Sequence, residues 1–87
     1  MKIKDEFIVR KIGTEYFAVS PARIAAGAGF IRLNETGLFL WNLFEKDTDV
    51  ETAAKALLEQ YEGIDYDTAL ADVKDYVEML QKADAIA

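Results

Sequence analysis

The chain has 87 residues, enough for one small domain, and it is 52% hydrophobic, with no cysteine and no histidine. These absences exclude a disulfide framework, a thiolate metal site and the commonest general base. Residues 1–33 carry six basic and three acidic side chains, whereas residues 34–87 carry four basic and thirteen acidic ones. Phosphate contacts need clustered Lys and Arg, so the acidic second part disfavours nucleic acid.

No segment has the composition of a membrane anchor or of a secretion signal. Residues 1–6 contain no apolar run, and no stretch approaches the ~20 apolar residues of a transmembrane helix. We therefore expect a cytoplasmic protein that does not contact a membrane.

Two β-forming runs, residues 7–12 and 15–20, predict a β-hairpin. Gly13-Thr14 separates them, and a two-residue loop that begins with glycine favours a type II′ turn. One face of the hairpin would carry Ile8, Arg10, Ile12, Phe17 and Val19, and the other Phe7, Val9, Lys11, Tyr16 and Ala18. Because neither face is polar, we expect helices to cover one. The other is either contacted by a partner or second copy, or shielded by the Lys and Arg side chains.

A connector over residues 21–28, in which residues 23–26 have the composition for one helical turn, leads to a third strand predicted over residues 30–33. At Asn34 the pattern changes from strand to helix, and a helix is predicted over residues 35–45. Asn34 is the predicted N-cap. Gly37 falls in the first turn, where we favour the close approach of another backbone over simple tolerance of glycine.

Two further helices are predicted over residues 49–61 and 66–82. The capping box formed by Thr48 and Glu51 predicts Thr48 as the first N-cap, and Asp65 is the second. The last helix has an apolar stripe made of Tyr66, Ala69, Leu70, Val73, Tyr76, Val77 and Leu80. Three strands followed by three helices predict an α+β fold of the winged helix-turn-helix type, in which a three-stranded antiparallel sheet precedes a three-helix bundle.

The residue types do not form a recognisable catalytic set. Asp72, Asp75 and Glu78 are spaced three residues apart, a spacing that can gather a cation, but a solvated acidic face is the favoured interpretation. Ser20 has no histidine or evident lysine as a base. We therefore expect a protein that is not an enzyme and has no metal or other cofactor.

The run Leu33-Asn34-Glu35-Thr36-Gly37, followed by an aromatic-rich helix that ends near Trp41, resembles the signature of the PqqD family, also called the RiPP precursor peptide recognition element. The resemblance extends from about Lys2 to Ile86 and includes the order of hairpin, third strand and three helices. It implies a single PqqD-like peptide-recognition domain over residues 1–87. The chain departs from the family at residues 83–86, where members often have a Gly-Leu-Ile-like turn.

The resemblance implies a non-catalytic adaptor. Such an adaptor binds the leader of a ribosomally synthesised precursor peptide as an added β-strand and presents it to a modifying enzyme such as a radical SAM protein. Carried over by position, the peptide-binding residues are Phe30, Ile31, Arg32, Leu33, Val73, Lys74, Tyr76 and Val77. Arg32 and Lys74 would then meet acidic leader residues. For Leu33, Val73 and Val77 the favoured alternative is a place in the core, and Tyr76 is compatible with either.

Two other functions are compatible with the pattern. A self-associating structural module would pair the hairpin and the open strand edge with a second copy, giving a homodimer. A DNA-binding winged helix is disfavoured, because the last helix carries more acidic than basic side chains.

Overall fold

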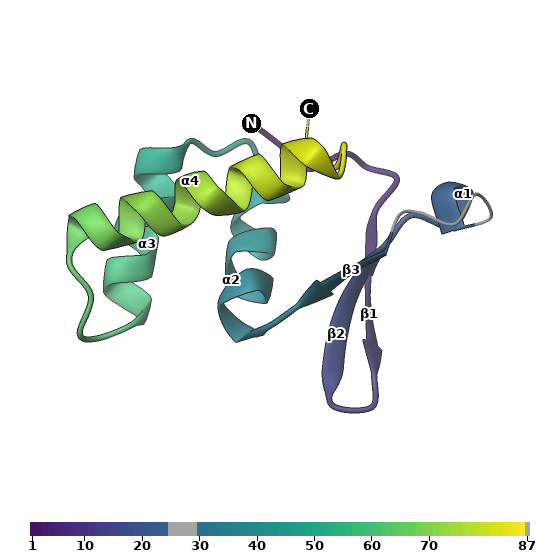
Figure 1. The fold of residues 1–87 in the computed structure, drawn as a ribbon, viewed down its shortest axis with the longest axis horizontal. Helices are drawn as coiled ribbons and strands as arrows, with labels where there is room; N and C mark the ends of the chain where they lie inside the picture. Colours follow the sequence, from purple (N-terminus) through teal and green to yellow (C-terminus); the bar gives the residue numbers. More distant parts are fainter. Residues whose placement is uncertain (25–29, 87) are drawn as a thin grey trace.

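The computed structural model describes residues 1–24 and 30–86. A three-stranded antiparallel sheet is followed by three long helices that gather at one end of it, while the hairpin projects away from them (Figure 1). The predicted fold class is confirmed. The elements in chain order are β1 (Ile8–Ile12), β2 (Glu15–Val19), α1 (Pro21–Ile24), β3 (Phe30–Leu33), α2 (Glu35–Phe44), α3 (Val50–Gln60) and α4 (Tyr66–Lys82). Within the expected turn over residues 23–26, Ala25 and Ala26 lie outside the described residues.

Strand β2 lies in the centre of the sheet, between β1 and β3. Ile12 pairs with Glu15, so the hairpin loop consists of Gly13 and Thr14 alone. Gly13 has φ +67°, whereas Thr14 does not have a positive φ. A positive φ at the first loop residue only is the pattern of a type II′ turn, and it explains the glycine at this position.

The two faces of the sheet alternate as predicted. Ala18 and Leu33 are buried on the face toward the hydrophobic core. On the opposite face, Phe17 pairs with Arg32 and its ring stacks on that of Phe30, with 4.6 Å between the ring centroids. Phe30 and Ile12 remain 55% and 57% exposed on this face. The sheet therefore presents apolar surface on the side away from the helices.

The hydrophobic core joins the inner face of the sheet to helices α2, α3 and α4. Its largest fully buried side chains are those of Trp41 and Phe44 on α2, and the ring of Phe7 meets Trp41 edge to face at 5.7 Å. Helix α3 packs along α4. The predicted stripe of α4 lies in or against this core, including fully buried Ala69, Val73 and Leu80.

Side-chain caps begin all three long helices. Asn34 accepts a hydrogen bond from the N–H of Gly37 at 2.7 Å, and Asp65 accepts one from Thr68 at 2.8 Å, as predicted. The prediction for α3 was wrong by one residue, because Asp49 is the N-cap and accepts from the N–H of Thr52. The hydroxyl of Thr48 instead donates to the carbonyl oxygen of Leu43 at 2.8 Å, at the end of α2.

The C-terminal segment docks against the N-terminal segment. Ile3 and Ile86 form an isolated antiparallel bridge, and both side chains are buried. Asp84 has φ +54°, a left-handed conformation in which glycine is the common residue. The chain therefore makes the turn after α4 with an aspartate, despite its departure from the family pattern.

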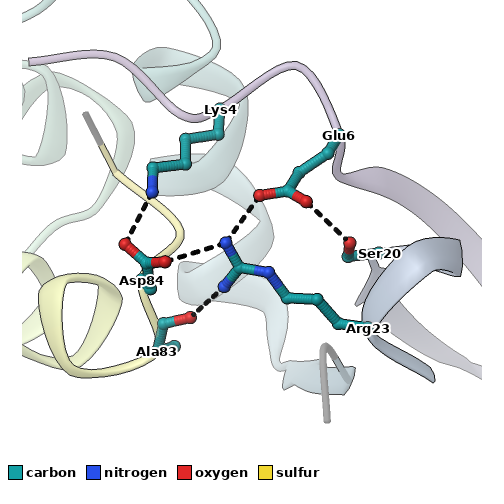
Figure 2. Close-up of polar contacts among 6 residues, drawn as sticks. All are labelled: Lys4, Glu6, Ser20, Arg23, Ala83 and Asp84. Atoms are coloured by element: carbon teal, nitrogen blue, oxygen red, sulfur yellow. Dashed lines mark hydrogen bonds and ion pairs between the residues drawn. The ribbon is translucent and has the colours of Figure 1, made fainter. Parts of the chain in front are cut away.

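A polar cluster of Lys4, Glu6, Ser20, Arg23 and Asp84 holds this docked segment to α1 (Figure 2). Arg23 donates to Glu6 at 2.6 Å and to Asp84 at 2.9 Å, and Lys4 donates to Asp84 at 2.6 Å. The guanidinium of Arg23 also donates to the carbonyl oxygen of Ala83 at 3.1 Å. The cluster fixes the start of the connector to β3 relative to the end of α4.

Among the described residues, no helix combines the length and the apolar composition needed to cross a membrane.

Candidate functional site

A groove of about 550 Å³ lies between the end of β3, the first turns of α2 and one side of α4. We refer to it as the β3–α4 groove. Its lining residues are Arg32, Leu33, Asn34, Thr36, Gly37, Leu40, Asp72, Tyr76 and Met79. Two consecutive elements, β3 and α2, therefore form one surface with α4, which is distant from them in the sequence.

Strand β3 is an edge of the sheet. Its one partner among the named strands is β2, and within the described residues no strand pairs with its other side. Figure 1 shows β3 running directly into α2. Since Arg32 and Leu33 at the end of β3 also line the groove, the open backbone edge and the groove are continuous. An open edge of this kind is a template for an additional strand.

The floor of the groove is apolar, and a hydrogen bond links the two helices that contribute to it. Leu33 and Leu40 are both buried at their positions on β3 and α2. The hydroxyl of Tyr76 on α4 donates a hydrogen bond to the carbonyl oxygen of Gly37 at 2.8 Å. Burial raises the pKa of Tyr76 well above its ordinary value, so the phenol stays protonated and keeps this bond.

Gly37 is buried, but the three atoms nearest to its Cβ position belong to side chains, and not to another backbone as the sequence predicted. A Cβ atom at this position would lie 3.0 Å from Oδ1 of Asn34 and 3.7 Å from the ring of Tyr76. The same Oδ1 accepts the capping hydrogen bond from the N–H of Gly37. Glycine therefore leaves room for the Asn34 cap, whereas the distance to the Tyr76 ring is that of an ordinary van der Waals contact.

The two charged side chains that line the groove, Arg32 and Asp72, differ in whether they already form an ion pair. The guanidinium of Arg32 donates to the carboxylate of Glu15 at 2.6 Å, so its charge is already paired within the sheet. Asp72 is exposed on the α4 side, and within the described residues no basic side chain lies within ion-pairing distance of it. The groove therefore offers one free carboxylate and no free cation from its lining residues.

The structure brings some of the predicted peptide-binding residues together and separates others. Arg32, Leu33 and Tyr76 line the groove, and Ile31 is half-buried beside them on β3. Phe30 is exposed on the outer face of the sheet, in its stack with Phe17.

The remaining predicted residues on α4 do not lie in the groove. Val73 and Val77 are buried in the core, which is the alternative that the sequence favoured, and neither lines the groove. Lys74 is exposed but is not among the lining residues. It is two residues from Asp72, which is about 200° around a helix and therefore on the far side.

The peptide-binding residues that were assigned from the family resemblance did not include several residues of the groove. Thr36 and Gly37 belong to the Leu-Asn-Glu-Thr-Gly run, so the motif itself marked them. Met79 follows Tyr76 by three residues on α4, which places both on one helix face. Asp72 precedes Tyr76 by four residues and was interpreted as part of a solvated acidic face.

The described residues contain no group of three or more Asp, Glu, His or Cys side chains arranged to hold a metal ion.

Comparisons with known proteins agree with this fold. Residues 24–86 match the model of a family described as coenzyme PQQ synthesis protein D, PqqD. A solved structure, that of TbiB1 in complex with the TbiA(beta) leader peptide, superposes with a TM-score of 0.77. The two sequences are 24% identical, and the match covers 98% of this chain and 93% of the other. No curated protein sequence matches the chain.

Proposed function

Because the chain belongs to the PqqD family, we propose that it is a non-catalytic adaptor for the biosynthesis of a modified peptide. In this proposal it binds the leader of a ribosomally synthesised precursor peptide and presents it to a modifying enzyme, such as a radical SAM protein. Residues 1–87 act together as one recognition domain. The similar fold of TbiB1, which has been solved with a leader peptide, supports this function.

The observation that carries the proposal is the continuity of the open β3 edge with the β3–α4 groove. An extended peptide that pairs with β3 gains main-chain hydrogen bonds, which give affinity without regard to sequence. Its side chains alternate, so every second one faces the helices. Those side chains enter the groove, where Leu33, Leu40 and Tyr76 supply apolar contacts that select them.

Proline substitution in β3 tests this mode of binding. In an antiparallel strand both backbone groups of a residue point to the same side, and neighbouring residues alternate. One of Ile31→Pro and Arg32→Pro therefore removes an N–H from the open edge, and the other removes one that pairs with β2. Circular dichroism and thermal melting identify the variant that stays folded, and that variant is used for binding.

The experiment is capture of peptides from native cell extract by the tagged parent and by the folded proline variant, with identification by mass spectrometry. A captured peptide is then synthesised and titrated calorimetrically. We expect binding to the parent and a loss of at least tenfold in the variant.

The matched control is a proline in β1, at Arg10 or Lys11, which alters the other edge of the sheet. Equal loss of binding in this control, or unchanged binding to the folded β3 variant, contradicts recognition at β3. Failure of the parent to retain any peptide contradicts the adaptor function itself.

Self-association is a second candidate, favoured by the apolar outer face of the sheet. Ile12 and Phe30 are more than half exposed there, and Ile8 lies on the same face. A homodimer through this face predicts a concentration-dependent mass in analytical ultracentrifugation that Phe30→Lys abolishes. A monomeric parent at all concentrations excludes it.

A further inference from the structure

The α4 side of the β3–α4 groove is acidic, and this charge affects which peptides the groove can bind. Asp72 is its acidic lining residue, and the adjoining surface of α4 continues with Asp75 and Glu78. Of these, Glu78 is paired with Lys82 at 3.1 Å. Asp72 and Asp75 have no basic side chain within ion-pairing distance in the described part of the chain. This side of α4 therefore presents uncompensated negative charge.

Of the basic residues that could offset this charge, one is paired and one is distant. Arg32 is bound to Glu15, and Lys74 lies on the opposite side of α4. The expectation that these two residues meet acidic leader side chains stays a prediction, and it requires Arg32 to leave Glu15. An acidic leader residue that faces α4 would meet Asp72 and be repelled.

Apolar and acidic surfaces lie side by side in the groove. Leu33, Leu40 and the ring of Tyr76 form the apolar part, and Met79 extends it along α4. Asp72 precedes Tyr76 by one helical turn, so its carboxylate adjoins the apolar floor. A single extended peptide can contact both, because its residues i and i+2 point to the same side.

We propose that the groove selects a leader segment in which a bulky apolar residue and a basic residue, Lys or Arg, are separated by one position. The apolar side chain occupies the floor, and the basic side chain pairs with Asp72. This inference rests on the proposed function, since it specifies the ligand of the same site.

The test is selection from a displayed library of random twelve-residue peptides on the immobilised protein. We expect the parent to enrich peptides with an apolar residue two positions from Lys or Arg. Selection on Asp72→Lys should remove this basic preference and favour an acidic residue at the same spacing. The folded proline variant of β3 should enrich neither.

A synthetic peptide of the enriched sequence then gives the size of the effect. We expect Asp72→Asn to weaken binding about two- to fivefold, the range of an exposed ion pair, and high salt to reduce this difference. Replacing the basic residue of the peptide with glutamine should weaken binding to the parent equally, and should change binding to Asp72→Asn little. Glu59→Gln, on the exposed side of α3, is the control with the same change in net charge.

The outcomes separate the two proposals. Peptides that bind through the β3 edge without a basic preference overturn the charge selection and leave the adaptor function standing. An unchanged preference on Asp72→Lys also overturns it. If the parent enriches no peptide whose binding depends on the β3 edge, the adaptor function fails, and the inference fails with it.

Discussion

The hydroxyl of Tyr76 and the carbonyl oxygen of Gly37 are joined by a hydrogen bond of 2.8 Å that links α4 to the first turn of α2. Both residues line the β3–α4 groove. The carbonyl oxygens of a helix's first turn normally accept hydrogen bonds from N–H groups of the same helix. A carbonyl oxygen can accept two hydrogen bonds, so the Gly37 oxygen can also accept the one from the Tyr76 hydroxyl. This bond holds the two helical walls of the groove at a fixed separation.

Tyr76→Phe removes this hydrogen bond and keeps the ring. We expect the free energy of unfolding to fall by about 1 kcal/mol, the usual net contribution of an intramolecular hydrogen bond. Urea denaturation followed by circular dichroism measures the change. Tyr66→Phe is the control, because Tyr66 is also half-buried and its hydroxyl has no hydrogen-bond partner among the described residues. Equal effects of the two substitutions would contradict a structural role for the Tyr76 hydroxyl.

Tyr76 also predicts a specific loss of stability in alkali. Burial raises its pKa in the folded protein above the ordinary value of 10.0, so the folded state retains the proton that the unfolded state releases. The stability from this group is therefore complete below pH 10 and declines as the pH rises above it. We expect the difference in unfolding free energy between the parent and Tyr76→Phe to narrow above pH 10. A difference that stays constant up to pH 11 would contradict this linkage.

Gly37→Ala tests the close approach at the start of α2. Alanine is the better helix former by about 0.5–1 kcal/mol, but its Cβ would lie 3.0 Å from Oδ1 of Asn34, so the capping side chain would have to shift. Because an N-cap contributes about 1 kcal/mol, we expect no gain in stability, or a small loss. In an Asn34→Gly background the obstructing atom is gone, and Gly37→Ala should then stabilise the protein. A double-mutant cycle by urea denaturation measures the coupling, and additive effects would show that the contact is irrelevant.

The fold followed from local signals in the sequence. The alternation of side chains along the strands predicted the two faces of the hairpin, and Gly13 predicted its turn. Asn34 and Asp65 predicted where two helices begin, because each caps its helix through a short-range hydrogen bond. The error at α3 arose because Thr48 and Asp49 are adjacent residues that both favour caps. A contact outside the local segment, from the Thr48 hydroxyl to Leu43, decided between them.

The groove was less predictable because it depends on how elements pack. The apolar stripe of α4 indicated which side chains are buried, but not which part of the stripe other elements cover and which part borders the groove. Val73 and Val77 fell on the covered part, whereas Tyr76 fell on its margin. Lys74 was carried over by position alone, and the helical period places it away from Asp72. Pairing of Arg32 with Glu15 depends on the sheet register, which the composition does not give.

Asp84 predicts an acid-sensitive docking of the C-terminal segment. Hydrogen bonding and charge from Lys4, together with the charge of Arg23, lower the pKa of its carboxyl below the ordinary 3.8. A lowered folded-state pKa gives stability that is present above the unfolded value and lost as the pH falls through the folded one. Asp84→Asn removes the charge and keeps a residue that tolerates the left-handed backbone. We therefore expect the parent to be the more stable of the two near neutral pH and the difference to shrink below pH 4. Because Asp84 is exposed, added salt at neutral pH should reduce the difference as well. Urea denaturation near neutral pH and below pH 4 measures the difference in unfolding free energy between the two proteins. A difference that does not depend on pH would show that the carboxylate charge does not hold the C-terminal segment.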